Sequence, residues 1–322
     1  MIAFGPVPSR RLGYSLGINN ISAKHCTYSC VYCQVGRTTH MQLERQEFYS
    51  VDQILAEVGQ KVIEVAEAGK KIDYLTLVPD GEPTLDLNLG KIIGGLKQFG
   101  IPVAVISNAS LIDRLDVQEE LMEADWVSLK VDSVDESVWR KINRPHRRLS
   151  LPRILEGMPA FKRKYPGKLV TESMLVAGLN DSAKTTRQLC DFLLKLQPSI
   201  SYLSIPTRPP AEVEVTPPSP ETLQEIIEIC AERVPFVDLL FEAEVGDFVS
   251  TGNLKEDILS ITAVHPLREE ALRDMVSASG GTWQVVEDLL AGGKISSIRY
   301  RDERYFLHYF KDIRRRNVEP VS

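Results

Sequence analysis

Six short apolar segments, each followed by an amphipathic helical pattern, constrain the fold more than any other feature of the sequence. A repeated strand–helix order predicts parallel strands joined by crossover helices, and so an α/β protein. Periodicity alone leaves open whether this sheet stays open or curls into a partial barrel. In either architecture ligands bind at the carboxyl ends of the strands. The predicted strands are rich in Val, Ile, Leu and Tyr and are bounded by Gly, Pro, Asn or Asp; they cover 15–21, 74–78, 102–107, 126–131, 169–176 and 201–205.

The pattern changes after about residue 251. Two helices are expected there, over 266–279 and 282–290, with Pro266 at the first helical position. Two strands follow, over 295–300 and 304–310, and together these elements have the outline of a winged-helix module. The chain is therefore predicted to form a domain over 1–250 and a small winged-helix-like α+β domain with a basic tail over 251–322.

Composition and charge exclude several classes of protein. Hydrophobic residues make up 43% of the 322 residues and charged residues 25%, which is typical of a globular chain rather than a disordered one. The net charge of −6 excludes a wholly basic nucleic-acid binder, although it allows a local basic surface. We find no apolar run of the roughly 18 residues that a membrane span needs and no signal peptide, so we expect a cytoplasmic protein without a membrane partner.

Three of the five cysteines lie within eight residues and follow the first predicted strand: Cys26, Cys30 and Cys33. Clustered thiols in a reducing compartment usually hold metal. An iron–sulfur cube normally takes four cysteines, so three local ligands would leave one iron open. Zinc with His25 or His40 as a fourth ligand is the alternative, which the spacing favours less. The other two cysteines, Cys190 and Cys230, lie in apolar helical patterns and are interpreted as small buried side chains.

The Cys-x3-Cys-x2-Cys spacing, with the aromatic Tyr32 before the last cysteine, resembles the signature of the radical S-adenosylmethionine (SAM) superfamily. The resemblance covers about residues 4–250 and implies a partial (β/α)6 TIM-like barrel. It implies a [4Fe–4S] cluster on the three cysteines, with SAM bound to the fourth iron. It also implies an electron donor of the flavodoxin or ferredoxin type and reductive cleavage of SAM to a 5′-deoxyadenosyl radical, which abstracts hydrogen from a substrate.

Further motifs agree with this resemblance. Asp80, Gly81 and Glu82 follow the second predicted strand and resemble the Gly-Gly-Glu motif of the family, with Asp80 in place of the first glycine. The resemblance assigns these residues to the methionyl ammonium group of SAM. Ser107 and Asn108 end the third predicted strand, where family members place short polar groups for the ribose hydroxyls.

The fourth predicted strand alternates between polar and apolar residues. Ser128, Lys130 and Asp132 share one face, which we expect to point into the lumen toward SAM or substrate. The alternative for Lys130 and Asp132 is a mutually satisfied ion pair.

A strongly basic segment suggests an anionic substrate. Residues 140–168 contain ten Lys or Arg and one acid, Glu156, and the C-terminal stretch 294–316 contains eight against three acids. One-signed segments near strand ends are typical of phosphate recognition, so RNA or a nucleotide is the predicted substrate. The candidate substrate residues are Arg144, His146, Arg147, Arg148 and Arg208.

Two stretches near the start of the chain, 7–13 and 17–20, resemble the wyosine-synthase-like, tRNA-modifying group of Fe–S oxidoreductases within that superfamily. Members of that group that modify tRNA carry a second cluster on additional cysteines, which this chain lacks. The alternative from another class is a redox-sensing, nucleic-acid-binding protein in which the cluster only signals and SAM is not consumed. A Gly81-Glu82 motif favours the enzyme, because a sensor has no need of a SAM pocket.

Overall fold

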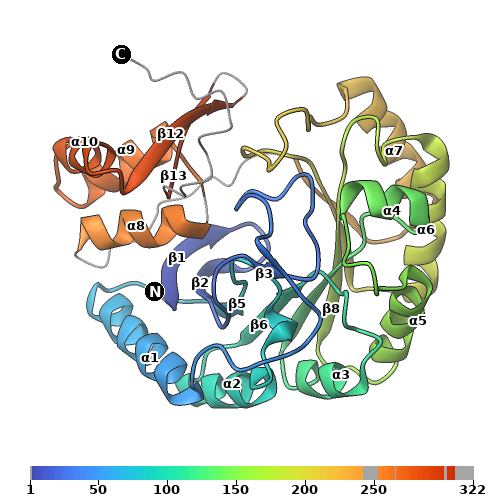
Figure 1. Ribbon diagram of the computed structural model, residues 1–322, viewed down its shortest axis with the longest axis horizontal. Coiled ribbons are helices and arrows are strands. Elements are labelled where there is room, and N and C mark those ends of the chain that lie inside the picture. Colours follow the sequence, from blue (N-terminus) through green and yellow to red (C-terminus); the bar gives the residue numbers. More distant parts are fainter. Residues whose placement is uncertain (1, 242–252, 265, 301–302, 309–322) are drawn as a thin grey trace.

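The computed structural model describes residues 2–241, 253–264, 266–300 and 303–308. Its main element is an eight-stranded sheet that curls into an open half-barrel, with helices around its outer face (Figure 1). The strand order is β1-β2-β5-β6-β7-β8-β9-β10. All pairs are parallel except β1 with β2. The strands are β1 (Ala3–Ser9), β2 (Gly13–Ile18), β5 (Tyr74–Leu77), β6 (Val103–Ser107), β7 (Trp126–Lys130), β8 (Lys168–Met174), β9 (Ile200–Ser204) and β10 (Val237–Leu240).

The six predicted strands are confirmed, with ends shifted by a few residues, whereas β1 and β10 were not predicted. Pro6 and Pro8 lie inside β1, and proline in a short run is a signal for a turn. The strand still forms because it lies at the edge of the sheet, where a residue without an amide hydrogen is tolerated. The second missed strand, β10, has only four residues at the opposite edge.

The helices on the outer face start where the sequence supplies capping side chains. Ser50, Ser182 and Ser219 each accept a hydrogen bond from the backbone amide three residues later, at the starts of α1, α6 and α7. The apolar stripes of these helices pack on the sheet and form the main core. The helices are α1 (Val51–Glu67), α2 (Leu89–Leu96), α3 (Leu115–Leu121), α4 (Glu136–Ile142), α5 (Leu151–Lys162), α6 (Ala183–Leu196) and α7 (Pro220–Arg233), with short 3-10 turns η1 (Pro83–Leu85) and η2 (Lys97–Phe99).

The turn between β1 and β2 closes one end of the half-barrel. Leu12 packs there against Trp126, Val170 and Tyr202, near the amino ends of the parallel strands. Arg10 in the same turn donates from Nη2 to the backbone oxygen of Leu239 in β10, at 3.0 Å. The first and last parts of the sheet are thus in contact across its open side.

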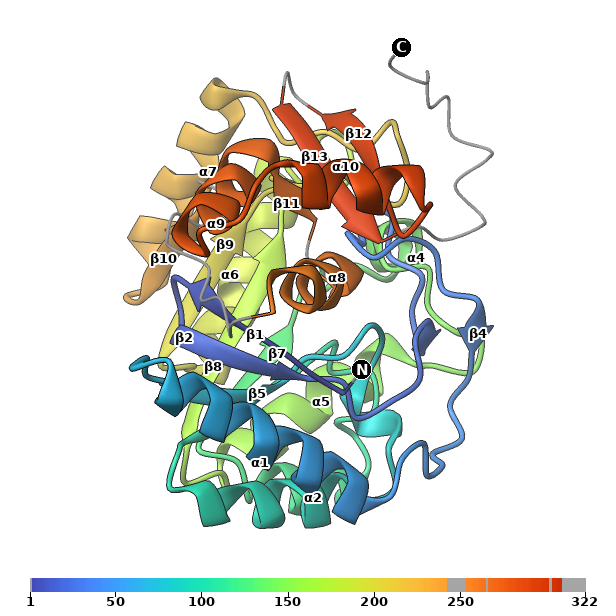
Figure 2. The ribbon, with the colours of Figure 1, turned by 90° about the vertical axis from the view of Figure 1, so that its left-hand side faces the viewer.

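The C-terminal module, residues 254–308, has a core of its own that includes Ile258, Leu272 and Phe306. It lies beside β1, with α8 next to that strand (Figures 1 and 2). Its sheet has the order β11-β13-β12 and is antiparallel. The elements are α8 (Leu254–Val264), β11 (Leu267–Arg268), α9 (Glu269–Ala278), α10 (Gln284–Ala291), β12 (Ile295–Tyr300) and β13 (Glu303–His308).

Part of the C-terminal prediction was wrong. The helix expected from Pro266 begins only at Glu269, because Leu267 and Arg268 pair with β13 as strand β11. Helix α8 was not predicted. The second helix and the hairpin are confirmed within one or two residues over the described part, and the basic tail over 314–316 lies outside the described residues. Among the described residues, no helix is long and apolar enough to cross a membrane.

Candidate active site

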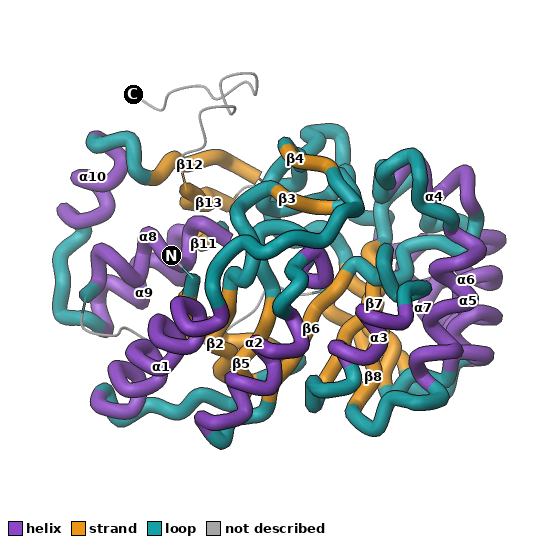
Figure 3. The backbone as a smooth tube through the Cα atoms, turned by 60° about the horizontal axis from the view of Figure 1, so that its bottom comes forward, coloured by secondary structure: helices purple, strands orange, loops and turns teal. Residues whose placement is uncertain are grey.

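The cysteine loop, residues 24–38, lies over the carboxyl ends of the strands (Figure 3). The short strand β3 (His25–Cys26) lies within the loop, and its partner β4 (His40–Met41) follows just after it. On one side the amide of Lys24 donates to the oxygen of Asp80 at 2.8 Å, and the amide of Glu82 donates to the oxygen of His25 at 3.1 Å. On the other side the amide of Val31 donates to the oxygen of Ile142 at 2.9 Å. The loop is therefore held between the end of β5 and the end of α4.

A cavity of about 380 Å³ lies beneath this loop, and that volume is in the range of small-molecule sites. It brings together most of the residues predicted from sequence. Those that line it are Cys26, Cys30, Cys33, Tyr32, Asp80, Gly81, Glu82, Ser107, Asn108, Lys130 and Arg208.

The three thiols lie in buried surroundings that suit iron ligands, and two of them face an amide donor. Burial raises the pKa of Cys30 to about 12, with the Asp132 carboxylate adding to the effect, and burial also raises the pKa of Cys26. Thiolates in such a place require a bound cation. Side-chain amides face two of the sulfurs: Asn108 Nδ2 lies 3.5 Å from Cys26 Sγ, and Asn143 Nδ2 lies 3.4 Å from Cys30 Sγ.

The histidines of the zinc alternative do not face this cavity. His25 stacks on His40 with ring centroids 4.4 Å apart, and its Nδ1 lies 3.1 Å from the oxygen of Ser22. Neither ring lines the cavity. Within the described ranges, no three His, Cys, Asp or Glu side chains converge as the ligands of a single ion do. The chemistry of the donor set therefore fits a thiolate-bound cluster better than a closed zinc site.

Glu82 joins the ends of two strands rather than standing alone in the cavity. Its Oε1 accepts from Ser107 Oγ at 2.7 Å, and its Oε2 accepts from the amide of Asn108 at 2.7 Å. Thr84 Oγ1 also donates to Oε1, at 2.7 Å. Burial raises the pKa of Glu82, and these donors favour its charged form. Ser107 and Asn108 thus have a partner in Glu82, which the sequence did not indicate.

Gly81 permits a close approach between two backbone segments of the protein rather than between backbone and ligand. A Cβ atom at this position would lie 1.9 Å from the oxygen of His25, so the cysteine loop and the Asp80–Glu82 motif meet backbone to backbone. Lys24, at the start of the loop, lies with Nζ 3.4 Å from Asp80 Oδ1. Burial nevertheless raises the pKa of Asp80 to about 6.

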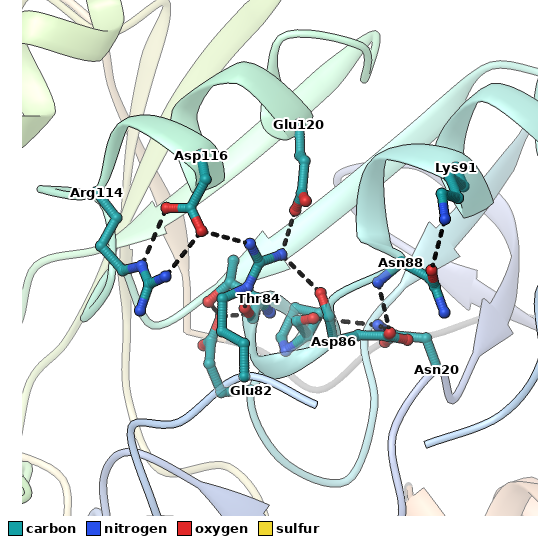
Figure 4. Close-up of polar contacts among 11 residues, drawn as sticks. Asn20, Glu82, Thr84, Asp86, Asn88, Lys91, Arg114, Asp116 and Glu120 are labelled. Carbon is teal, nitrogen blue, oxygen red and sulfur yellow. Dashed lines mark hydrogen bonds and ion pairs between the residues drawn. The ribbon is translucent and has the colours of Figure 1, made fainter. Parts of the chain in front are cut away.

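A buried arginine that the sequence did not single out binds the backbone just after this motif. The Arg45 side chain is 2% exposed and donates to the backbone oxygens of Thr84 at 2.8 Å and Asp86 at 2.6 Å. Asp116 and Glu120 of α3 accept from the same guanidinium. Figure 4 shows these two carboxylates beside Thr84 and Asp86. Arg45 lies in an irregular polar loop, where no local pattern distinguishes a buried arginine from an exposed one.

Lys130 enters the cavity but pairs with Glu172 instead of Asp132, at 3.1 Å. Arg11, from the turn between β1 and β2, contacts the other oxygen of Glu172. Lys130 also lies over the Tyr32 ring, 5.1 Å from its centroid. The ion pair expected between Lys130 and Asp132 was therefore wrong in its partner, because the register of β7 on β8 sets Lys130 opposite Glu172.

Ser128 and Asp132 do not line this cavity. Strand β7 ends at Lys130, so the predicted alternation stops before Asp132. Asp132 accepts from Asn143 Nδ2 at 2.6 Å, from the amide of Met174 at 2.8 Å and from the Tyr32 hydroxyl. It therefore joins the cysteine loop to β8 and to Asn143, a residue not among the site predictions.

The basic segment does not form one surface at the cavity. Arg144 pairs with Glu212 at 2.6 Å, and Arg148 pairs with Glu44. His146 and Arg147 lie outside the cavity, so of the five candidate substrate residues Arg208 alone lines it, with its guanidinium 2.9 Å from Gln34 Oε1. The segment continues along α5 to Lys168 at the amino end of β8, the end opposite the cysteine loop.

The chain is similar to known proteins over most of its length. The family model of the Radical SAM superfamily matches residues 20–192. The UPF0026 protein MJ1312 of Methanocaldococcus jannaschii is 45% identical over 318 residues, which cover 98% of each chain. A UPF0026 protein of Helicobacter pylori strain J99 is 35% identical over 65% of this chain and 67% of its own length.

Two solved structures share the fold over about seven tenths of this chain. A radical SAM methyltransferase from Sphaerobacter thermophilus has a TM-score of 0.57 and 16% identity, and the match covers 70% of this chain and 66% of that one. Streptococcus suis SuiB bound to S-adenosylmethionine has a TM-score of 0.51 and 12% identity, over 71% of this chain and 51% of that one.

Proposed function

Because the chain belongs to the radical SAM superfamily, whose members are enzymes that use a [4Fe–4S] cluster and SAM, we propose that its cavity holds both cofactors. Cys26, Cys30 and Cys33 would ligate the cluster. A cluster bound there would supply the electron for reductive cleavage of SAM, and the resulting 5′-deoxyadenosyl radical would abstract hydrogen from the substrate.

The observation that carries this proposal is that the three thiols and the Asp80–Glu82 motif line one cavity. Asp80 and Glu82 supply carboxylates for an ammonium group, and the backbone beside Gly81 adds carbonyl oxygens. Lys130 supplies a cation for a carboxylate. The cysteine loop lines the cavity and, with the cofactors bound, would limit the access of water and so protect a reactive radical.

For the substrate we propose an RNA or nucleotide, as the basic segments suggest, with Arg208 as the contact inside the cavity. Arg147, which lies outside the cavity, would contact phosphates at the surface. The C-terminal module supports this view because its elements follow the order helix, strand, helix, helix, strand, strand, as in a winged helix. Salt-sensitive retention of RNA that is lost on reversing the charges of Arg147 and Arg148 would support the proposal. Retention that is absent or indifferent to both changes would contradict it.

A finer assignment to the wyosine-synthase-like group rests on the stretches over 7–13 and 17–20 and stays a prediction. A flavodoxin- or ferredoxin-type protein is the proposed electron donor. We propose a reducing compartment such as the cytoplasm for the chain, because thiols that bind iron stay reduced there.

The test is anaerobic reconstitution with iron and sulfide, followed by a 5′-deoxyadenosine assay under dithionite. We expect about four irons per chain and production of 5′-deoxyadenosine. Replacing any of Cys26, Cys30 or Cys33 by alanine should remove the iron and the product. The matched control is Cys190→Ala, which removes a thiol that does not line the cavity and should leave both intact.

Other results of the iron analysis and the 5′-deoxyadenosine assay would favour one of the alternative classes of protein. Four irons without SAM cleavage would favour the redox-sensing alternative. Zinc as the only metal after anaerobic purification would contradict both cluster hypotheses.

A further inference from the structure

Two cysteines outside the active site face each other between α6 and α7. The Sγ atoms of Cys190 and Cys230 are 2.8 Å apart, although the residues are 40 positions apart in the sequence. Both side chains are fully buried, on the faces by which α6 and α7 join the main core. The sequence indicated two unrelated apolar side chains, whereas the structure brings them into contact.

The surroundings make the two sulfurs chemically unequal. The hydrogen bond between the two thiols is the largest cause that lowers the pKa of Cys190, and the nearby Arg233 guanidinium acts in the same direction. The same contact and burial raise the pKa of Cys230. Arg233 also pairs with Asp191 at 2.7 Å, which connects the same two helices at the surface. Cys190 is therefore the sulfur that ionises first, and the thiolate is the reactive form.

We propose that Cys190 and Cys230 form a dithiol site that hydrogen peroxide converts into a disulfide between α6 and α7. The Cys190 thiolate attacks one peroxide oxygen and the O–O bond breaks. The departing hydroxide takes up a proton and leaves as water, and Cys190 becomes a sulfenic acid. The Cys230 sulfur then attacks Cys190 Sγ, its proton joins the departing hydroxyl group, and a second water leaves. Two thiols lose two electrons to one peroxide molecule, which is of similar size to water and suits a buried site.

The position of the site gives the bond a structural consequence. Strand β9 and the cavity residues Ile205 to Arg208 lie between α6 and α7 in the sequence. A disulfide would enclose this segment in one covalent loop and would restrict how far the two helices can separate. Closing a loop of about 40 residues corresponds to a rise of about 5 °C in the thermal midpoint for a chain of this length.

The test is a non-reducing peptide map of the full-length protein, purified anaerobically, treated with peroxide and alkylated under denaturing conditions. Trypsin separates Cys190, in peptide 188–195, from Cys230, in peptide 196–233, because Pro209 blocks cleavage after Arg208. The three cysteines of the active-site loop all lie in a third peptide, 25–37. We expect a species joining 188–195 to 196–233 that is two hydrogens lighter than its parts and that disappears with dithiothreitol.

Two controls separate this result from general oxidation. In Cys230→Ala, peptide 188–195 should carry sulfenic or higher oxides and no link. In a chain with Cys26, Cys30 and Cys33 replaced by alanine, oxidation should raise the thermal midpoint by about 5 °C, and adding Cys190→Ala should abolish this rise.

Three outcomes would overturn the proposal. The first is recovery of peptide 188–195 fully alkylated at peroxide levels that oxidise peptide 25–37. The second is a link from Cys190 to peptide 25–37 alone. The third is a 188–195 to 196–233 link that forms without any change in the thermal midpoint, which would place the link in unfolded chains.

Discussion

Replacing Gly81 by alanine should separate the cysteine loop from the Asp80–Glu82 motif. The added Cβ would lie 1.9 Å from the backbone oxygen of His25 and 2.7 Å from Ile21 Cδ1. Because Cβ contacts under 3.0 Å essentially never occur, the two backbones must move apart by about 1 Å. That movement breaks or weakens the two hydrogen bonds between the segments, at 2.8 and 3.1 Å.

The magnitude follows from these contacts. Each backbone hydrogen bond contributes about 1 kcal/mol, and overpacking at a buried site costs about 1–3 kcal/mol. We therefore expect Gly81→Ala to lower the free energy of unfolding by about 3–5 kcal/mol and to reduce the iron bound on reconstitution. Urea denaturation of the metal-free chain measures the first effect, and iron analysis after anaerobic reconstitution measures the second.

The matched control is Gly94→Ala. Gly94 lies in α2, and a Cβ there would meet no atom within 4 Å. Alanine should be tolerated and should stabilise the helix by up to about 1 kcal/mol. If Gly81→Ala unfolded within about 1 kcal/mol of the natural chain and bound the same iron, the close backbone approach would be refuted.

Three further predictions concern the polar contacts around the cavity. Glu172→Gln leaves Arg11 and Lys130 without their shared carboxylate. It should lower the free energy of unfolding, measured in urea at neutral pH, by about 3–5 kcal/mol. A loss under about 1 kcal/mol would contradict a shared buried charge. Burial raises the pKa of Asp86 to about 6, above its unfolded value near 4, so the folded chain binds the proton more tightly and gains stability as the pH falls. The unfolding free energy of the natural chain minus that of Asp86→Asn should therefore rise by about 1 kcal/mol from pH 7.5 to pH 5, and a difference that stays flat or falls would show that Asp86 has an ordinary pKa. Arg45→Met should lower the free energy of unfolding by about 3–5 kcal/mol in the same urea assay. Arg45→Lys should restore little of this loss, because lysine lacks the planar guanidinium that reaches several acceptors, and full recovery by lysine would contradict that geometry.

The strands could be predicted where one local signal sufficed. Each of the six predicted strands is a short apolar run with a turn residue at its ends, and such a run has few alternatives to a buried parallel strand. Strand β1 was missed because its two prolines are compatible with a strand only at a sheet edge, and edge position is a property of the whole fold. The same holds for β11, two residues that are a strand only because β13 pairs with them.

In the candidate site, too, local motifs were predictable from the sequence, whereas contacts set by the whole fold were not. The cysteine spacing and the Asp80–Glu82 motif are local, and both sets of residues line the predicted cavity. The partner of Lys130 was not predictable, since it depends on how β7 and β8 are aligned. A glycine at position 81 indicated a close approach, but its neighbour, the oxygen of His25, belongs to a segment more than fifty residues earlier.

The contact between Arg10 and Leu239 has a consequence for biosynthesis. A ribosome makes the β1–β2 turn first, yet one of its partners emerges only after more than two hundred further residues have been translated. Until then, Leu12 and the inward faces of the early strands lack part of their cover, so the nascent chain must remain incompletely closed. Chaperone protection and slow release of the nascent polypeptide are expected to matter most during that interval, and chains truncated before β10 should be recovered mainly as aggregates or protease fragments.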